Sequence, residues 1–326
     1  MPPQIFTFEA VSAAIEKISP LAVVKAMADG FRLYSAGRVS VAPIQTLGQP
    51  PLANFVGHPD AQACIKSAYE NGGDYFVSKV ASGGGGLNSG LVMVFSQKNF
   101  APEAIILDEG HLTELRTAAA GALAAQQWAP AEIGHVAMIG CGIQARWQLK
   151  TLGAVVKTRR LRCWARRREQ ADEYASEMRK SGWDVEVATS AANAVDGAGL
   201  VLTTTPARQP ILKKEDIAVG KDVTLICVGA DSPGKHECDA SLVASAALVV
   251  CDSVSQCVER GEVQHAVAAG LLRREALVEC GSALSEQPPR RRPPGLVIFD
   301  STGVAIQDVK MAELALDVLR SPAGKL

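Results

Sequence analysis

An aspartate and a lysine follow an apolar strand in the stretch TLICVGADSPGKHECD, residues 224–239. Asp231 and Lys235 are four positions apart, on a segment that also contains two glycines and a proline. A carboxyl group and an ammonium group in such a place can exchange protons with a bound molecule. The same composition is typical of an Asx turn followed by a solvated lysine. The choice between the two interpretations depends on what else lies near this strand end.

A glycine-rich turn occurs earlier in the chain. The stretch VAMIGCGIQA contains Gly140, Gly142 and Ala145 in the pattern GxGxxA, with Ile143 and Gln144 as the intervening pair. The first glycine permits a tight turn, the second lets the backbone approach a pyrophosphate, and the small third residue allows close helix–strand packing. An ordinary tight turn could contain similar residues. Because the pattern follows a strand and opens a helix, it favours a dinucleotide site made by these five residues.

Three arginines bear on which dinucleotide is bound. NAD sites usually end the second strand with an acid for the ribose hydroxyls, whereas NADP sites place an arginine nearby. Here the strand LRCWA is followed by Arg166, Arg167 and Arg168, and the first acid is Glu169. A guanidinium matches a 2′-phosphate well, so Arg166 and Arg167 favour NADP(H), with NAD(H) as the alternative. A basic first turn of a surface helix would look the same.

The repeated alternation of strands and helices predicts the fold. From about residue 134 onward, apolar strands alternate with helical patterns, which indicates a parallel sheet covered on both faces. In such a sheet, ligands lie beyond the carboxyl ends of the strands. Asp231 and Lys235 are therefore expected where a nicotinamide would lie. Thr203 and Val228, each at the end of a predicted strand, are expected to contact the same cofactor.

The preceding segment predicts a second, smaller domain. It contains a helix ending near Gly37, alternating strands over 62–96 interrupted by a flexible loop at 83–90, and a helix over 112–129. A last helix, 305–321, is expected to return to this domain. The prediction is an α/β protein with a doubly wound Rossmann domain over 126–302. A smaller α+β domain for substrate binding and dimerisation is expected over 1–125, completed by 303–326.

Composition excludes several classes of partner. The 326 residues are 48% hydrophobic and 21% charged, which suits two folded domains. A net charge of −1 gives no reason to expect nucleic acid or an anionic membrane as partner. No run reaches the roughly 18 apolar residues of a membrane span, and no secretory leader is evident. The eight cysteines form no CxxC pair and show no zinc spacing, so we expect no metal and a reducing, cytoplasmic location.

Four motifs together resemble the ornithine cyclodeaminase/mu-crystallin family. They are LTELRTAAAGALAA (112–125), IGCGIQA (139–145), VGADSPGKHE (228–237) and DSTGVAIQD (300–308), in the family's order. The resemblance implies a Rossmann domain, an N-terminal substrate domain that forms a homodimer, and oxidoreductase or cyclodeaminase chemistry. By position, Arg116 is similar to the family's carboxylate clamp, Lys79 to its substrate-domain lysine and Asp231 to its catalytic acid/base. Residues similar to the family's cofactor contacts are Thr117, Lys235 and Ser301.

Two positions depart from the family's pattern. Gln45 stands where members commonly carry an arginine, and Lys66, in KSAY, stands where many carry an apolar residue. Both are treated as candidate substrate-binding residues. Strand alternation places Lys66 and Ala68 on one face, with Lys79 on the next strand. Lys66 is either an edge-strand lysine that points outward, or a cation that replaces the one missing at Gln45 or binds a second substrate carboxylate.

The sequence supports two enzymatic hypotheses. The first is an NADPH-dependent reductase of an α-imino acid such as 1-pyrroline-2-carboxylate, 1-piperideine-2-carboxylate or iminosuccinate, or an amino-acid dehydrogenase in reverse. The second is an ornithine-type cyclodeaminase that recycles bound NAD. The arginines favour the reductase, while Asp231 also suits the base that ring closure requires. A protein that only holds NADPH is a third hypothesis, which Asp231, Lys79 and Arg116 disfavour.

Overall fold

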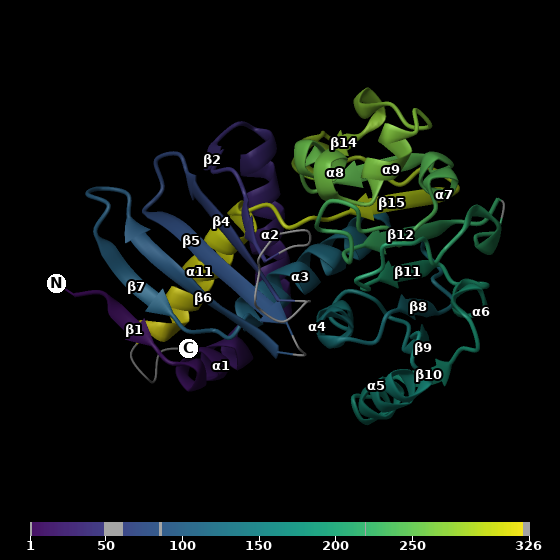
Figure 1. Ribbon diagram of the computed structural model, residues 1–326, viewed down its shortest axis with the longest axis horizontal. Helices are drawn as coiled ribbons and strands as arrows, with labels where there is room; N and C mark the ends of the chain where they lie inside the picture. Colours follow the sequence, from purple (N-terminus) through teal and green to yellow (C-terminus); the bar gives the residue numbers. More distant parts are fainter. Residues whose placement is uncertain (1, 49–60, 85–86, 219, 322–326) are drawn as a thin grey trace. The chain divides into compact units, whose positions relative to one another are not determined.

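The computed structural model describes residues 2–48, 61–84, 87–218 and 220–321 (Figure 1). The chain divides into two compact units: unit 1 is Met1–Arg116 with Val304–Leu326, and unit 2 is Thr117–Gly303. The chain leaves unit 1 inside helix α3 (His111–Trp128) and returns just before helix α11 (Ile306–Leu319). The division expected from the sequence, after residues 125 and 302, falls in the same helix and the same connection.

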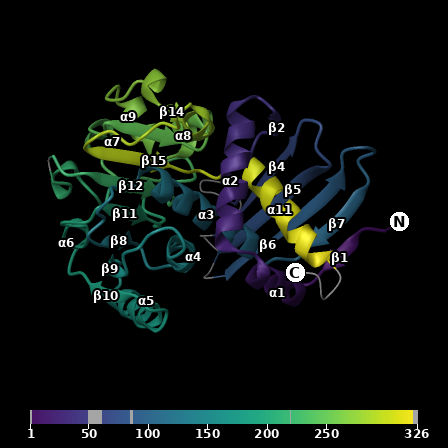
Figure 2. The ribbon, with the colours of Figure 1, turned by 180° about the vertical axis from the view of Figure 1, so that it is seen from behind.

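Unit 1 is built on a mainly antiparallel sheet. Its described strands follow the order β1-β7-β6-β5-β4-β2, with β3 also paired to β4, and only β1 and β7 run parallel. The strands are β1 (Gln4–Phe6), β2 (Val39–Val41), β3 (Gln45–Leu47), β4 (Gln62–Glu70), β5 (Tyr75–Gly84), β6 (Leu87–Ser96) and β7 (Pro102–Ile106). Figure 2 shows α11 crossing these strands beside α2 (Pro20–Ser35), and α1 (Phe8–Lys17) also packs against α11.

The register of β4 and β5 fixes the position of two lysines. Lys66 on β4 pairs directly with Lys79 on β5, so both side chains leave the sheet on the same face. β4 pairs with β5 on one side and with β2 and β3 on the other, and the exposed fraction of Lys66 is 6%. The interpretation of Lys66 as an outward-pointing edge lysine is therefore wrong. The contacts of α11 with β4 and β5 indicate that this helix covers the face.

Unit 2 is a parallel sheet in the order β10-β9-β8-β11-β12-β15-β13-β14 within the described residues. The strands are β8 (Val136–Ile139), β9 (Arg160–Trp164), β10 (Asp184–Val187), β11 (Leu200–Thr203), β12 (Val223–Cys227), β13 (Leu248–Cys251), β14 (Val278–Glu279) and β15 (Leu296–Asp300). The α-helices are α4 (Ile143–Leu152), α5 (Arg168–Lys180), α6 (Ala191–Val195), α7 (Ala240–Ala244), α8 (Val254–Arg260), α9 (Val263–Ala268) and α10 (Cys280–Ser285). The first five strands have the usual dinucleotide-binding order, 3-2-1-4-5.

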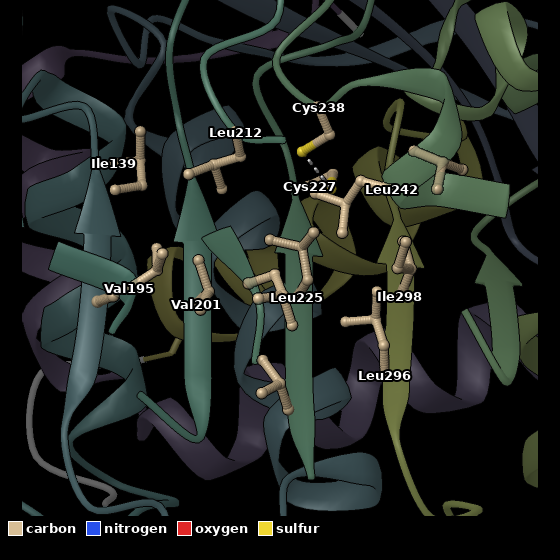
Figure 3. Packing of buried hydrophobic residues seen from close by; sticks show 14 of the residues in the cluster. Ile139, Val195, Val201, Leu212, Leu225, Cys227, Cys238, Leu242, Leu296 and Ile298 are labelled. Carbon is tan, nitrogen blue, oxygen red and sulfur yellow. Dashed lines mark hydrogen bonds between the residues drawn. The ribbon is translucent and has the colours of Figure 1, made fainter. Parts of the chain in front are cut away.

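The central strands of unit 2 are buried along their whole length, as continuous apolar runs in a two-sided parallel sheet should be. Figure 3 shows Ile139, Val201, Leu225 and Ile298 side by side on four neighbouring strands. The predicted doubly wound α/β fold with a smaller α+β unit is confirmed.

Helix α3 contains one glycine, Gly121, for a packing reason. A Cβ there would lie 2.2 Å from Oε1 of Gln148 on α4, so the glycine allows the two helices to approach closely. Among the described residues, no helix combines the length and apolar character needed to cross a membrane. All eight cysteines lie in the described part of the chain and are free thiols.

Candidate functional site

The turn after β8 forms the floor of a pocket in unit 2. Gly140 has a φ of 98°, and a Cβ there would lie 2.8 Å from Cγ2 of Thr205, so the protein's own packing requires a glycine. At Gly142 a Cβ would meet no protein atom within 4 Å. The cavity has a volume of about 520 Å³. Its lining includes the turn 140–142, the end of β9 with Arg166 and Arg167, and the segment 204–208 after β11.

The N-terminus of α4 faces this turn without a side-chain cap. Gly142 is the N-cap residue and makes no capping hydrogen bond, which leaves the first backbone N–H groups for an anion. Ala145 is buried, and its small side chain suits close packing at this point. Its backbone carbonyl accepts a hydrogen bond from the hydroxyl of Tyr174 on α5. Gln144 accepts a hydrogen bond from Gln148, and Ile143 is half exposed. The five turn residues therefore lie together as expected.

Two of the three arginines after β9 line the pocket. Arg166 and Arg167 are exposed and contribute to its wall. Arg168 forms an exposed ion pair with Asp172 on α5, 3.0 Å away, which turns it toward the helix surface. The pair that the sequence assigned to a 2′-phosphate is thus the pair at the cavity.

A further arginine, which sequence reasoning missed, holds the turn in place. Arg146 donates to the carbonyls of Cys141 and Gly142, at 2.9 and 3.1 Å. Its guanidinium also makes a bidentate pair with Glu177 on α5, at 2.6 and 2.8 Å, and this hydrogen bonding lowers the pKa of Glu177. A bidentate pair fixes both helices relative to the turn. Its only sequence signal was a cation in the first turn of α4.

The ends of β11 and β12 are joined by a buried carboxyl group, also missed from the sequence. Glu237 accepts hydrogen bonds from the hydroxyl of Thr203, from both the N–H and the hydroxyl of Thr205, and from the N–H of Gly229, over 2.6–3.0 Å. Burial raises the pKa of Glu237 despite these bonds. Thr203, expected to contact a cofactor, is thus engaged in this buried network, and its neighbour Thr205 lines the pocket.

Asp231 and Lys235 lie on the loop after β12, beside the pocket's rim. Lys235 Nζ contacts Asp231 Oδ1 at 2.6 Å, and the Ser232 hydroxyl donates to the same oxygen at 3.1 Å. The Asp231 side chain is 48% exposed and that of Lys235 is 15% exposed. Arg208, which lines the cavity, donates to the carbonyl of Pro233 in this loop. The acid and the cation are therefore paired at the carboxyl edge of the sheet.

Three further expected cofactor residues lie in unit 2. Val228 is buried after β12, and its N–H donates to the Thr203 carbonyl. Ser301 follows β15, and its hydroxyl donates to Asp252 Oδ2 at 3.0 Å. Thr117 lies on α3, and its carbonyl accepts a hydrogen bond from Gln148 on α4. Val228 and Ser301 lie at the same edge of the sheet as the turn, since β12 and β15 are neighbours.

Unit 1 holds a separate, buried cluster of charges. Asp308 Oδ1, on α11, lies 3.1 Å from Arg116 Nε and 3.3 Å from Lys79 Nζ, and these three side chains are at most 5% exposed. Burial lowers the pKa of Lys79 to about 8. The positive charges of Arg116 and Lys66 also lower this pKa, whereas the negative charge of Asp308 raises it. Burial alone would raise the pKa of Asp308, but the nearby cations lower it on balance.

The cluster includes Lys66 but not Gln45. Lys66 lies beside Lys79 and acts electrostatically on both Lys79 and Asp308. Gln45 is exposed on β3 and pairs with Ile65, whose side chain leaves β4 on the face opposite Lys66. The structure therefore does not bring Gln45 to the cluster. Asp308 was not predicted as a site residue, although the motif DSTGVAIQD ends on it.

Among the described residues, one group of potential metal ligands lies elsewhere in unit 2. Ligand atoms of Cys251, Cys257 and Asp300 lie within 4.8 Å of one another, and all three residues are buried. Burial raises the pKa of Cys257 well above its usual value and that of Asp300 to about 7. Cys257 also donates to Asp252 and to the Asp300 carbonyl. These contacts suit a packed cluster in which burial keeps the two thiols protonated.

Comparison with known proteins places this geometry in a family. The model of the ornithine cyclodeaminase/mu-crystallin family matches residues 83–322. A Rhizobium meliloti (strain 1021) protein with a provisional dehydrogenase name is 36% identical over 315 residues, covering 93% of each chain. The iminosuccinate reductase of Paracoccus denitrificans is 28% identical, covering 89% of this chain and 91% of its own. A solved archaeal alanine dehydrogenase, described as a dimer with bound NAD, is 28% identical with a TM-score of 0.84, covering 98% of this chain and 96% of its own. Because the match spans well over half of its length, the chain belongs to the ornithine cyclodeaminase/mu-crystallin family.

Proposed function

We propose that the protein is an NADPH-dependent reductase of an α-imino acid, or an amino-acid dehydrogenase when the reaction runs backwards. The observation that carries the proposal is the pair Arg166 and Arg167 at the wall of the dinucleotide pocket. Guanidinium groups suit a 2′-phosphate, where an NAD site would place an acid. A net reduction draws on NADPH, whereas an enzyme that regenerates its own bound NAD has no need of it.

Three features of the pocket support the binding of a dinucleotide there. No protein atom lies close enough to Gly142 to exclude a side chain there. A ligand that approaches the backbone at this position would explain the glycine. The uncapped N-terminus of α4 would hold the pyrophosphate, and Arg166 with Arg167 would hold the 2′-phosphate. When bound, the cofactor supplies a hydride to the imine carbon.

Unit 1 supplies the groups for an α-carboxylate. Arg116 is oriented by Asp308 and by Gln307, whose side-chain oxygen lies 3.4 Å from its Nη1, and Lys79 lies beside it. Fixing the carboxylate fixes the C=N group next to it. Asp231, held by Lys235, is the group that delivers the proton to the nitrogen. One hydride on carbon and one proton on nitrogen convert the imine to the amino acid.

The names of two relatives support this reaction class. Iminosuccinate reductase is named for the reduction of an imino acid, and alanine dehydrogenase for the oxidation of an amino acid. The test is a panel of imino acids and amino acids, followed at the nicotinamide absorbance with NADPH and with NADH. We expect net oxidation of NADPH with at least one imino acid. No net change with any member of the panel would overturn the proposal.

The choice of cofactor has its own test. Replacing Arg166 and Arg167 together by Ala should weaken NADPH binding by roughly 10- to 100-fold, the value of one or two charge-assisted contacts, and NADH binding much less. Arg168→Ala is the matched control, because Arg168 is paired with Asp172 on the helix surface. Equal losses for both cofactors would contradict the assignment.

The second candidate is a cyclodeaminase that recycles bound NAD. Asp231 favours it, since ring closure needs a base for a side-chain amine, and the family's name includes this activity. Ornithine or lysine in the same panel distinguishes the two. Release of ammonia without net change in nicotinamide absorbance identifies a cyclodeaminase.

We further propose that the protein acts as a homodimer formed through unit 1. The archaeal alanine dehydrogenase, 28% identical, is described as a dimer. Light scattering coupled to size-exclusion chromatography measures the mass directly, and a monomer at micromolar concentration would contradict the proposal.

A further inference from the structure

The loop after β12, which carries Asp231 and Lys235, is held by two side chains from the first turn of α9. Gln264 donates from Nε2 to the carbonyl of Lys235 at 3.2 Å, and its Oε1 accepts from the N–H of Gly234 at 2.8 Å. The ring of His265 contacts the same Lys235 carbonyl through Nε2 at 2.9 Å. Because a carbonyl oxygen can only accept, this ring nitrogen carries the proton and donates. One carbonyl of the loop is therefore held twice.

The end of the loop is fixed more deeply in unit 2. The N–H of His236 donates to the carbonyl of Ala207, in the segment that lines the dinucleotide pocket. The N–H groups of Glu237 and Cys238 donate to the carboxyl group of Glu262, the residue before α9, over 2.7–3.1 Å. Glu237, Cys238 and Glu262 are all buried, so these bonds anchor the chain where it returns to the core.

Gln264 and His265 act on a different part of the loop. They contact residues 234 and 235, and Gly234 is exposed. The His265 ring also stacks on the ring of His236, with centroids 3.8 Å apart and an angle of 18° between the planes. This stack holds the His265 ring while its Nε2 donates to the loop. The core is already anchored by Glu262, so the fold does not require these further contacts at an exposed turn.

Lys235 connects these contacts to Asp231. Its N–H donates to the carbonyl of Ser232 at 3.1 Å, and its carbonyl accepts from Gln264 and His265, so its backbone is fixed on both sides. Its Nζ contacts Asp231 Oδ1 at 2.6 Å, and its side chain is only 15% exposed. A fixed backbone and a largely buried side chain confine the ammonium, and the ammonium confines the carboxyl group that it contacts.

We propose that His265 and Gln264 are positioning residues for Asp231. By holding the Lys235 carbonyl, they set where the Lys235 ammonium, and through it the Asp231 carboxyl, meets the nitrogen of the substrate. The inference rests on the proposed function for the role of Asp231, whereas the contacts themselves do not depend on it. A misplacement of about 1 Å in a reacting group can cost about 100-fold in rate, so a small movement of this loop is enough to slow the reaction.

The first experiment compares two replacements of His265. His265→Phe keeps a planar ring for the stack on His236 but has no donor, whereas His265→Gln gives up the ring and keeps an N–H donor. We expect kcat to fall about 5–20-fold in His265→Phe, the value of one hydrogen bond, and to stay within about twofold of the wild type in His265→Gln. KM and NADPH affinity should change less than about threefold in both. Wild-type kcat in His265→Phe, or equal losses in the two variants, would overturn the proposal.

The second experiment separates positioning from general structural support. In a protein that already carries Asp231→Asn, adding His265→Phe should lower kcat by less than about twofold, because the carboxyl group through which His265 acts is gone. Single-turnover measurement of hydride transfer gives both rates. Losses that multiply in the double variant would show that His265 acts independently of Asp231, against the proposal.

The third experiment measures the loop without turnover. Hydrogen exchange on the NADPH-loaded full-length protein should be about 5–20-fold faster over residues 231–238 in His265→Phe than in the wild type or in His265→Gln. Gln264→Leu should have the same effect, because it leaves the Gly234 N–H without its acceptor. The strand β8 is the internal control and should be unchanged. Equal exchange over 231–238 in all four proteins would overturn the proposal.

These readouts separate this inference from the proposed function. If no amino or imino acid is turned over, the proposed function fails, and hydrogen exchange still decides whether His265 and Gln264 hold the loop. If imino acids are reduced and Asp231→Asn is slow, but His265→Phe matches the wild type, the function stands and the positioning role is refuted.

Discussion

Lys79, which we propose binds the substrate, shows how burial sets the pH range in which a lysine is charged. Its pKa is lowered from 10.5 to about 8, first by burial, then by the charges of Arg116 and Lys66. The ammonium is therefore present below about pH 8 and lost above it. An exposed lysine would stay charged to pH 10, so the carboxylate site is expected to weaken within the range where most enzymes are assayed.

We predict that KM for the substrate rises above about pH 8, by up to tenfold per pH unit, while NADPH binding changes less. Between pH 8 and 10.5, Lys79 keeps its proton in the unfolded chain but has lost it in the folded protein. The free energy of unfolding should therefore rise with pH over this range. Lys79→Arg provides the comparison, since a guanidinium does not titrate in this range. A KM that stays flat to pH 9.5 in the wild-type protein would contradict the assignment.

The proposed role of Asp231 as a proton donor can also be tested by changing this one residue. We predict that Asp231→Asn lowers kcat by 10²–10⁴-fold, the usual loss of a general acid or base. NADPH affinity should stay within about threefold, because Asn keeps the side-chain oxygen that Lys235 contacts at 2.6 Å. Stopped-flow measurement of hydride transfer and fluorescence titration of NADPH check both parts. Turnover like that of the wild type would leave Asp231 as a turn residue.

At the scale of elements, the turn between β8 and α4 contains two glycines that are present for different reasons. Gly140 is needed by the fold, because φ is 98° and a Cβ would lie within 3.0 Å of three atoms of Thr204 and Thr205. Gly142 has an ordinary φ of −84° and open space around it. The fold does not require the second glycine, and the proposed cofactor would explain it.

This contrast gives a matched pair of variants. Gly140→Ala should lower the unfolding free energy by about 1–3 kcal/mol. Gly142→Ala should change it by less than about 1 kcal/mol, yet weaken NADPH and NADH alike by more than about tenfold, because the methyl group occupies the pyrophosphate's approach. Urea unfolding without cofactor and dinucleotide titration separate the effects. Unchanged cofactor binding in Gly142→Ala would refute the ligand's role there.

Local patterns predicted the elements of unit 2 well, because its continuous apolar strands and the GxGxxA turn are signals within short windows. The loop expected at 83–90 was wrong at the described positions, because Gly83 pairs with Asn88 and Gly84 with Leu87 as part of β5 and β6, while positions 85 and 86 lie outside the described residues. Long-range contacts decided the rest. Asp308 lies 192 positions from Arg116, and Glu237 joins two strand ends, so neither role has a local signal.

At the scale of the whole molecule, the last helix completes the first unit. The buried face of α11 includes Asp308, Ile306 and Leu316, and the helix packs on α2, β4 and β5. Without α11, the sheet would expose apolar surface and leave Lys79 and Arg116 without their carboxylate. The stability of unit 1 therefore depends on residues at both ends of the chain.

We predict that a chain ending at Gly303 loses unit 1 but retains unit 2. Limited trypsin digestion followed by mass spectrometry should degrade residues 1–116 and leave a fragment near 117–303, whereas the full-length chain resists in both units. Asp308→Asn keeps the helix and removes its charge, and should lower the unfolding free energy of unit 1 by about 3–5 kcal/mol, the cost of breaking a buried ion pair. A truncated chain that is protected over 1–116 would contradict the prediction.

The return of α11 also has a consequence during synthesis. The ribosome finishes the first 116 residues, then makes all of unit 2, before the helix that covers β4 and β5 emerges. At 5–20 residues per second this interval is roughly 10–40 s. For that time the nascent sheet carries Lys66 and Lys79 without Asp308 and has an uncovered apolar face, the kind of surface that chaperones bind. The amount of active enzyme in a cell should therefore depend on translation speed through unit 2 and on chaperone supply, even for variants whose finished fold is unchanged.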